Sequence, residues 1–164
     1  MFRKLISTDN DPMLTLMRLV LGAVFFAHGA QKLLGWFGGF GYTATMAAFS
    51  QQMGIPAALA FIAIAAEFFG GIGLLSGFLG RVAALGISID MLVAILKVHL
   101  HNGFFMNWYG NQKGEGFEYH LLVLAIGLTL VVRDPGAWSL DRVLASLGRS
   151  ARVLRAIPPQ RRAA

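Results

Sequence analysis

The sequence contains no cysteine among its 164 residues. This absence excludes disulfide bonds, thiol catalysis, iron–sulfur clusters and cysteine-ligated zinc within the chain. It also excludes the four-helix membrane enzymes that pass electrons between a quinone and a disulfide. Charged residues are scarce as well, at 13%, whereas soluble domains carry about 25%. With 56% hydrophobic residues and a mean hydropathy of +0.63, the composition indicates an integral membrane protein.

The positive charge is unevenly distributed along the chain. From Arg133 onward there are seven Arg and two Asp, a net charge of +5 out of the total of +6. The sequence pI of about 10.3 is in the range of nucleic-acid-binding proteins. Here, however, the charge lies in a tail beside hydrophobic segments. This placement favours the anionic surface of a lipid bilayer, and not nucleic acid, as the partner.

Four apolar segments are candidates for crossing a bilayer, which takes about 20 residues. They are Met13–Leu34, Ala57–Leu79, Arg81 to about Leu100, and Phe117–Val132. The last has 16 residues and reaches only about 24 Å at 1.5 Å per residue, which is short for a span. It is accepted because Glu118 marks a helix start and Asp134-Pro135-Gly136 marks a helix end. The sequence therefore predicts an all-α fold, a four-transmembrane-helix bundle over residues 1–137.

Lys and Arg in the connecting segments predict the orientation. The first loop, 35–56, has none, and the third, 101–116, has only Lys113. These two segments alternate with three that are richer in positive charge, so both termini are expected in the cytoplasm of a multi-pass cell-membrane protein. Residues 138–164 are then a basic cytoplasmic tail.

The tail pattern predicts a basic amphipathic helix followed by a disordered end. Ser139 can cap the helix start, and apolar residues recur at helical spacing with Arg mostly between them. The apolar positions are Leu140, Val143, Leu144, Leu147, Ala151 and Leu154, and the basic ones are Arg142, Arg149, Arg152 and Arg155. Such a helix suits the inner leaflet; a solvated helix with an ordinary apolar face is the alternative.

Ionisable residues occur inside the predicted spans, where each costs about 3 kcal/mol near the bilayer centre. Arg18, His28, Gln31 and Lys32 share one broad stripe of the first span, which should face the other helices. Lys32 taken alone is better explained by snorkelling to the outer interface. Its side chain is long enough for that, whereas His28 is too short.

Glu67 lies near the middle of the second span, with small residues on its face that permit close approach of another helix. A buried glutamate must be paired with a cation or carry a proton. Arg18 is the predicted cation, and the pair is interpreted equally as a structural salt bridge or as part of a functional site. Asp90 occupies the middle of the third span, on nearly the same stripe as Lys97.

Polar side chains from three helices are expected to converge in the outer half of the bundle, under an aromatic lip. The polar set is His28, Lys32, Lys97, His99, His101, Glu118 and His120, and the lip is Trp36, Phe37, Phe104, Phe105, Trp108 and Tyr109. An aromatic belt at the membrane interface is the alternative. His28, His99 or His101, Glu118 and His120 are metal-ligand types, but no two have a strong i, i+4 spacing, so no metal site is predicted.

Three stretches resemble the DoxX-like family of small four-span membrane proteins. They are "RLVLGAVFFAHGAQKLLGWFGG", "AAEFFGGIGLLSGFLGRVAALG" and "EYHLLVLAIGLTLVV", and they lie between Arg18 and Val132. The family takes its name from a subunit of a membrane thiosulfate:quinone oxidoreductase. The resemblance therefore implies a four-helix membrane fold and a redox role that involves a quinone.

The leading hypothesis is a quinone-linked membrane oxidoreductase or the membrane subunit of one. Proton relays would be His28, Glu67, His99, Glu118 and His120; Lys32 and Lys97 would stabilise a phenolate, and Trp36, Phe104, Phe105 and Trp108 would line the cofactor site. The sequence holds no electron carrier, so electrons must come from a substrate or from a soluble or membrane redox partner. The alternatives are a non-catalytic scaffold that docks a soluble redox enzyme, and a small-solute or proton pathway; a homo-oligomer stays open.

Overall fold

The computed structural model describes residues 5–147, and within this range every regular element is a helix. The four main helices are α2 (Pro12–Leu34), α4 (Ala57–Ser76), α5 (Gly80–Ala94) and α6 (Glu118–Val132). Short elements lie between them: the 3₁₀ turns Trp36–Gly38 and Leu100–Asn102, α3 (Gly41–Ala47), and the π-helical segments Ala48–Gln52 and Ile95–His99. Three helices, Pro12–Leu34, Ala57–Ser76 and Gly80–Asn102, are long and apolar enough to span a membrane, and α6 is a shorter apolar helix. The predicted helical membrane bundle is confirmed.

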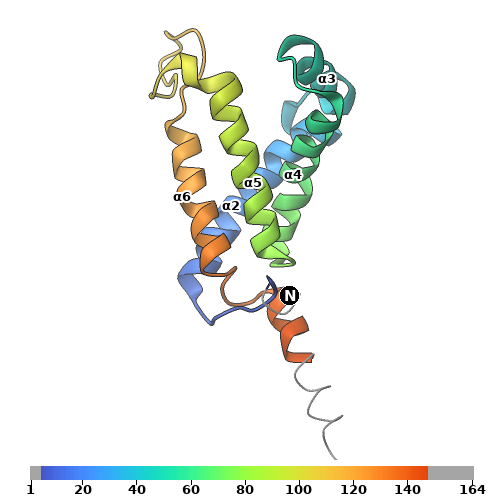
Figure 1. Cartoon of the computed structure of the whole chain (residues 1–164), viewed down its shortest axis with the longest axis vertical. Helices are drawn as coiled ribbons and strands as arrows, with labels where there is room; N and C mark the ends of the chain where they lie inside the picture. Colours follow the sequence, from blue (N-terminus) through green and yellow to red (C-terminus); the bar gives the residue numbers. More distant parts are fainter. Residues whose placement is uncertain (1–4, 148–164) are drawn as a thin grey trace, which may run out of the picture.

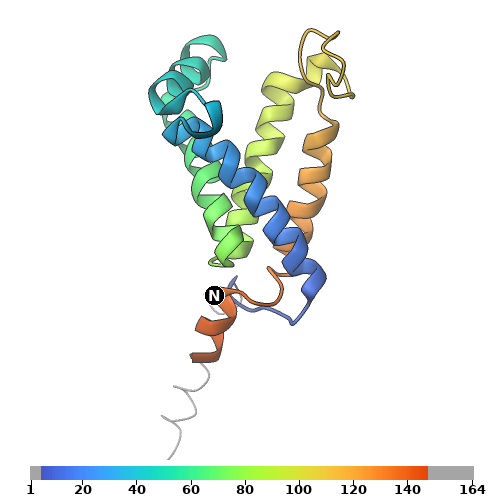
Figure 2. The ribbon, with the colours of Figure 1, turned by 180° about the vertical axis from the view of Figure 1, so that it is seen from behind.

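The helices form a bundle with two different ends (Figures 1 and 2). The terminal end carries the turn 77–79 and the segments that precede α2 and follow α6. The loop end carries the connections 35–56 and 103–117, which lie on opposite sides in both views. α2 crosses the bundle diagonally, starting near α6 at the terminal end and finishing near α4 at the loop end (Figure 2).

Local chemistry explains the limits of α2, which differ by one residue from the predicted Met13–Leu34. The Asp11 carboxylate accepts hydrogen bonds from the N–H groups of Met13 (2.8 Å) and Leu14 (3.3 Å), which satisfies two of the otherwise unpaired donors at a helix start. At the other end Gly35 has φ of +73°, a left-handed conformation that glycine adopts without strain.

Glycines bring α2 and α4 into backbone contact. A Cβ atom on Gly29 would lie 2.4 Å from the Cα atom of Phe68, and one on Gly71 would lie 2.4 Å from the nitrogen of Phe26. Any side chain at either position would therefore force the helices apart. This small-residue contact is the kind on which membrane helices rely, because lipid supplies no hydrophobic drive for their association.

Arginines hold the terminal end together by binding the last carbonyl groups of helices. The Arg18 guanidinium donates to Leu74 O (2.6 Å) and Leu75 O (3.1 Å) of α4, and also to Ala137 O and Trp138 O. Leu74 and Leu75 belong to the last turn of α4, where a cation also complements the helix dipole. The predicted salt bridge between Arg18 and Glu67 is therefore wrong.

Arg81 acts in the same way on α6, donating to the carbonyls of Val131 (3.0 Å), Val132 (3.2 Å) and Arg133 (2.6 Å). Together, Arg18 and Arg81 bind the carboxyl ends of the two helices that run toward the terminal end. Both arginines thus serve the architecture of this end.

Asp141 fastens the segment after α6 to the turn between α4 and α5. Its buried carboxylate accepts from the N–H groups of Leu79 (2.8 Å) and Gly80 (3.0 Å), and its own N–H donates to Gly77 O (3.0 Å). A helix runs from Leu140 to the last described residue, Leu147. The first residues after the 1–137 unit therefore pack against the bundle, while Ala151, Leu154, Arg149, Arg152, Arg155 and the end predicted to be disordered lie outside the described residues.

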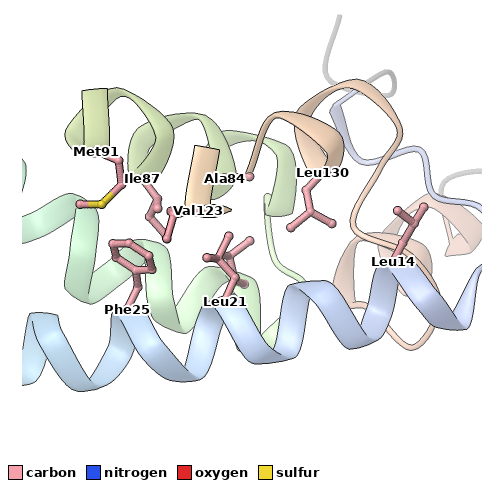
Figure 3. Close-up of a cluster of buried hydrophobic side chains, with 9 residues drawn as sticks. Leu14, Leu21, Phe25, Ala84, Ile87, Met91, Val123 and Leu130 are labelled. Carbon is pink, nitrogen blue, oxygen red and sulfur yellow. The ribbon is translucent and has the colours of Figure 1, made fainter. Parts of the chain in front are cut away.

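A hydrophobic core fills the space between the four helices (Figure 3). Its nine buried members are Leu14, Leu21, Phe25, Leu74, Ala84, Ile87, Met91, Val123 and Leu130. The core runs from Leu14 and Leu130, toward the terminal end, to Phe25, Met91 and Val123, toward the loop end. The space between the four helices is thus filled mainly by apolar side chains.

We expect Gly29→Ala to destabilise the protein by about 1–3 kcal/mol through overpacking, because the new methyl group would overlap the backbone of Phe68. Gly86→Ala is the matched control: its methyl group would lie 3.8 Å from the Ala66 Cβ, an ordinary contact. Thermal unfolding in detergent compares the two. Equal melting temperatures for both variants would contradict the close helix approach.

Candidate functional site

A salt bridge joins α2 to α4 within the spanning region. Lys32 Nζ lies 2.5 Å from Glu67 Oε2, and the two side chains are 26% and 7% exposed. Gly29, one turn before Lys32, is the residue that touches the backbone of Glu67 and Phe68. The close approach of the helices therefore sets the ammonium against the carboxylate. Lys32 points into the bundle, so the snorkelling interpretation of this residue is wrong.

The other two helices add one polar side chain each. Asp90 of α5 lies within electrostatic range of both Glu67 and Lys32. Tyr119 of α6 lies within electrostatic range of Glu67, and its hydroxyl is buried without a partner among the described residues. We call Lys32, Glu67, Asp90 and Tyr119 the central polar cluster. Every main helix contributes one member to it.

His28 borders this cluster from the surface. It lies one turn before Lys32 and is within electrostatic range of Lys32 and Glu67. Its side chain is nevertheless exposed, so the expectation that the whole stripe faces other helices is wrong for this residue. The exposure of His28 and the partial exposure of Lys32 give the cluster an accessible edge along α2.

His99 and His120 form a separate pair at the loop end of α5 and α6. Their ring centroids are 4.1 Å apart, His120 is buried, and its Nδ1 atom has no partner among the described residues. His99 Nδ1 lies 2.8 Å from the carbonyl oxygen of Glu115; since a carbonyl only accepts, this nitrogen carries the hydrogen. His99 ends a π-helical segment, whose wider turn changes the facing of side chains relative to a regular helix.

Glu118 organises the loop before α6. One carboxylate oxygen accepts from the backbone N–H of Met106 (2.8 Å) and from the indole N–H of Trp108 (3.2 Å). Glu115 acts similarly on the N–H of Asn107 (2.7 Å). These bonds give Glu118 a clear structural task, and its predicted role as a proton relay remains a prediction.

The other predicted site residues are exposed at the loop end. They are Lys97, His101, Trp36, Phe104, Phe105 and Trp108. Trp36 packs against Phe26, whereas Phe104 packs against Phe117. The two aromatic segments lie on opposite sides of the bundle (Figures 1 and 2), so the structure does not join them into one cover.

The central polar cluster combines an ammonium, two carboxyl groups and a phenol. This set can bind a polar head group, stabilise a negative charge on oxygen, and exchange protons. Among residues 5–147, no group of three or more His, Asp and Glu side chains is arranged to hold a metal ion. The sequence analysis did not identify Tyr119 and did not assign Asp90 to the site. The position of Asp90, an ionisable residue in the middle of a predicted span, was a signal that could have placed it there.

Comparisons with known proteins agree with this picture. The DoxX family profile matches residues 13–100, which include α4, α5 and all of α2 except Pro12. The chain is 32% identical over 148 residues to "Uncharacterized membrane protein Rv3486" of Mycobacterium tuberculosis, covering 86% of each chain. It is 30% identical over 128 residues to "Inner membrane protein YqjF" of Escherichia coli, covering 77% of this chain and 88% of the relative.

A further relative carries a name that mentions an activity. "Putative oxidoreductase CatD" of Bacillus subtilis is 30% identical over 115 residues, which cover 70% of this chain and 75% of the relative. No solved structure matches the chain.

We expect Lys32 and Glu67 to be energetically coupled by about 1–3 kcal/mol in a double-mutant cycle of Lys32→Met and Glu67→Gln. Lys32→Met should destabilise more than Glu67→Gln, because Asp90 remains near Lys32 in the second variant. Unfolding by SDS in mixed micelles measures both. Lys113→Met removes an exposed lysine and serves as the control, and strict additivity in the cycle would refute the ion pair.

Proposed function

Since the chain belongs to the DoxX family of membrane proteins, we propose that it is a quinone-linked oxidoreductase, specifically the membrane subunit that binds the quinone. The observation that carries the proposal is the central polar cluster, to which all four helices contribute and which has an accessible edge at His28. Because α2 spans the bilayer, a lipid-soluble ligand can reach this edge from the membrane.

The cluster matches the chemistry of a quinone head group. Reduction of a quinone to a quinol takes up two electrons and two protons. The Lys32 ammonium can stabilise the anionic oxygen that forms first, the hydroxyl of Tyr119 can donate a hydrogen bond to a carbonyl, and carboxyl groups can supply protons. His28 at the edge is a further proton carrier near neutral pH.

Electrons must come from outside the chain in this proposal. The sequence has no cysteine and no dinucleotide-binding fingerprint, so we propose a partner protein that carries a flavin, haem or iron–sulfur group. The basic terminal end, predicted to be cytoplasmic, would then lie on the inner leaflet. The relative named as an oxidoreductase supports a redox role, and a scaffold for a soluble redox enzyme is the second candidate.

The packing of the core argues against a transmembrane pathway. Except for Met91, which follows Asp90 on α5, each core residue lies nearer the terminal end than the cluster member on the same helix, and all nine are apolar. A proton or solute that entered from the loop end would meet this plug. The cluster therefore suits a site that opens toward one side of the membrane.

We expect liposomes that contain the protein to conduct protons no faster than empty liposomes, because apolar core side chains from all four helices lie between the polar cluster and the terminal end. A pH-sensitive dye trapped inside the vesicles measures the flux after a pH step. Flux that rises with the protein and falls in Glu67→Gln would support the pathway in place of the binding site.

We expect the purified protein in nanodiscs to bind a short-chain ubiquinone or menaquinone saturably, and Lys32→Met to weaken this binding about 10- to 100-fold. A charge-assisted hydrogen bond is worth about 1.5–3 kcal/mol, and about 1.4 kcal/mol corresponds to a factor of ten. Equilibrium dialysis measures the affinity, with Lys113→Met as the control that should bind like the wild type. Binding that is absent, or that is equally strong without Lys32, would refute the quinone site.

A further inference from the structure

Two hollows at the terminal end share Asn10 and Arg142 in their walls. The smaller hollow, of about 540 Å³, is lined mainly by the segment 6–10 that precedes α2. The larger hollow, of about 680 Å³, is lined by Asn10 of that segment, by Ser76 at the end of α4, and by residues of the segment 138–146. Three parts of the chain that are far apart in sequence therefore form the wall of the larger hollow.

The charges around the larger hollow favour an anion. Its lining residues are Asn10, Ser76, Trp138, Ser139, Leu140, Arg142, Val143 and Ser146, and of these Arg142 alone is charged. The smaller hollow adds the carboxylate of Asp9, which would repel an anion there. The buried carboxylate of Asp141 is bound by the N–H groups of Leu79 and Gly80. The positive charge of Arg142 is therefore not neutralised by any residue that lines the larger hollow.

Arg142 offers hydrogen-bond donors in the geometry that a phosphate group accepts. A guanidinium carries five N–H groups in one plane and can bind a phosphate through two of them at once. Among residues 5–147, Asn10 is the one hydrogen-bond partner of the Arg142 guanidinium, which donates to the Asn10 Oδ1 atom. This bond ties the helix 140–147 to the segment before α2 and positions the guanidinium. Its other N–H groups are available to a ligand.

The larger hollow lies where a spanning helix leaves the hydrocarbon of the bilayer. Ser76 is the last residue of α4, which is long and apolar enough to span a membrane. Trp138 is 80% exposed, and tryptophan is enriched at the level of the lipid head groups because its ring is apolar and its N–H is polar. Leu140 and Val143 are also exposed. The wall therefore combines a cation with an exposed apolar surface, which suits an amphiphilic ligand.

We propose that the larger hollow binds the head group of one anionic phospholipid from the leaflet at the terminal end. The phosphodiester accepts hydrogen bonds from the Arg142 guanidinium, and the acyl chains lie along the exposed apolar side chains beside the hollow. This site is independent of the proposed quinone chemistry. It also differs from a general attraction of the basic tail to the bilayer, because a built site binds one lipid, whereas a charged surface attracts many.

Native mass spectrometry of the protein released from detergent micelles counts the bound lipids. As phosphatidylglycerol is added, the wild type should bind a first lipid at lower concentrations than a second one. It should bind phosphatidylcholine more weakly, because the choline ammonium would lie near Arg142. Equal loading of the two lipids, or loading without a preferred single lipid, overturns the site. Inorganic phosphate tests the other source of the same chemistry: if it displaces the lipid at equal concentration, the lipid assignment fails.

Two matched variants separate the site from the overall charge. Arg142→Gln and Arg133→Gln each remove one exposed arginine from the terminal end, so both should keep the melting temperature of the wild type. Arg142→Gln should weaken the binding of phosphatidylglycerol at least about 10-fold, the loss expected for a charge-assisted hydrogen bond. Arg133→Gln should bind like the wild type. Equal weakening in both variants, or unchanged binding in Arg142→Gln, overturns the site.

The fluorescence of Trp138 locates the bound lipid. The chain has three tryptophans, so Trp36→Phe combined with Trp108→Phe leaves Trp138 as the single one. Phosphatidylglycerol with bromine atoms on its acyl chains near the glycerol should quench this emission to saturation, over the same concentrations that load the first lipid. In Arg142→Gln the quenching should require higher concentrations. If the first lipid binds and the Trp138 emission is not quenched, the lipid lies elsewhere and the proposal fails.

Discussion

The rest of the structure depends on the need to compensate charged groups inside a membrane-spanning bundle. An ammonium or a carboxylate surrounded by hydrocarbon is costly unless it finds a partner. Lys32 and Glu67 satisfy this need across the contact between α2 and α4. They can meet only because Gly29 lets the two backbones touch. A small residue at one position thus makes possible an ion pair one turn away, and Asp90 and Tyr119 lie within electrostatic range of its carboxylate.

The need to compensate buried charge is met in different ways by the two basic residues of α2, Arg18 and Lys32. Arg18 has a planar group with several donors and binds four carbonyl oxygens at the terminal end. Lys32 is a compact charge on a flexible stem and serves a single carboxylate. The guanidinium therefore suits a place where several backbone segments converge, and the ammonium suits a site that exchanges partners. This difference follows from the chemistry of the two groups. It agrees with a structural role for the terminal end and a ligand-binding role for the central polar cluster, which lies nearer the loop end.

Most of the fold follows from the sequence, because apolar length and capping residues define the spans. The apolar run predicts the limits of α2 to within one residue, and Asp11 and Gly35 cap the helix there. The partners of the polar residues do not follow in the same way, because loop lengths leave the relative depth of the helices open. Arg18 lies level with Leu74 and Leu75, about 11 Å along the α4 axis from Glu67, which explains why their predicted pairing fails. His99 lies in a π-helical segment, whose register no regular spacing anticipates. Tyr119 carries no charge at neutral pH, so a search of the predicted spans for charged residues does not find it.

The two ends of the bundle differ in how they satisfy their polar groups, and this difference bears on function. At the terminal end Asp141, Arg18 and Arg81 bind backbone atoms, so removing any of them leaves unpaired groups of the chain itself. In the central polar cluster the partners are side chains, and the hydroxyl of Tyr119 has none among the described residues. A buried hydroxyl without a hydrogen-bond partner destabilises the folded protein. A ligand that accepts a hydrogen bond from this hydroxyl would remove that cost. The apolar core separates the two regions. A ligand that enters near His28 therefore meets groups that can change partners and protonation, while the packing that holds the helices together stays in place.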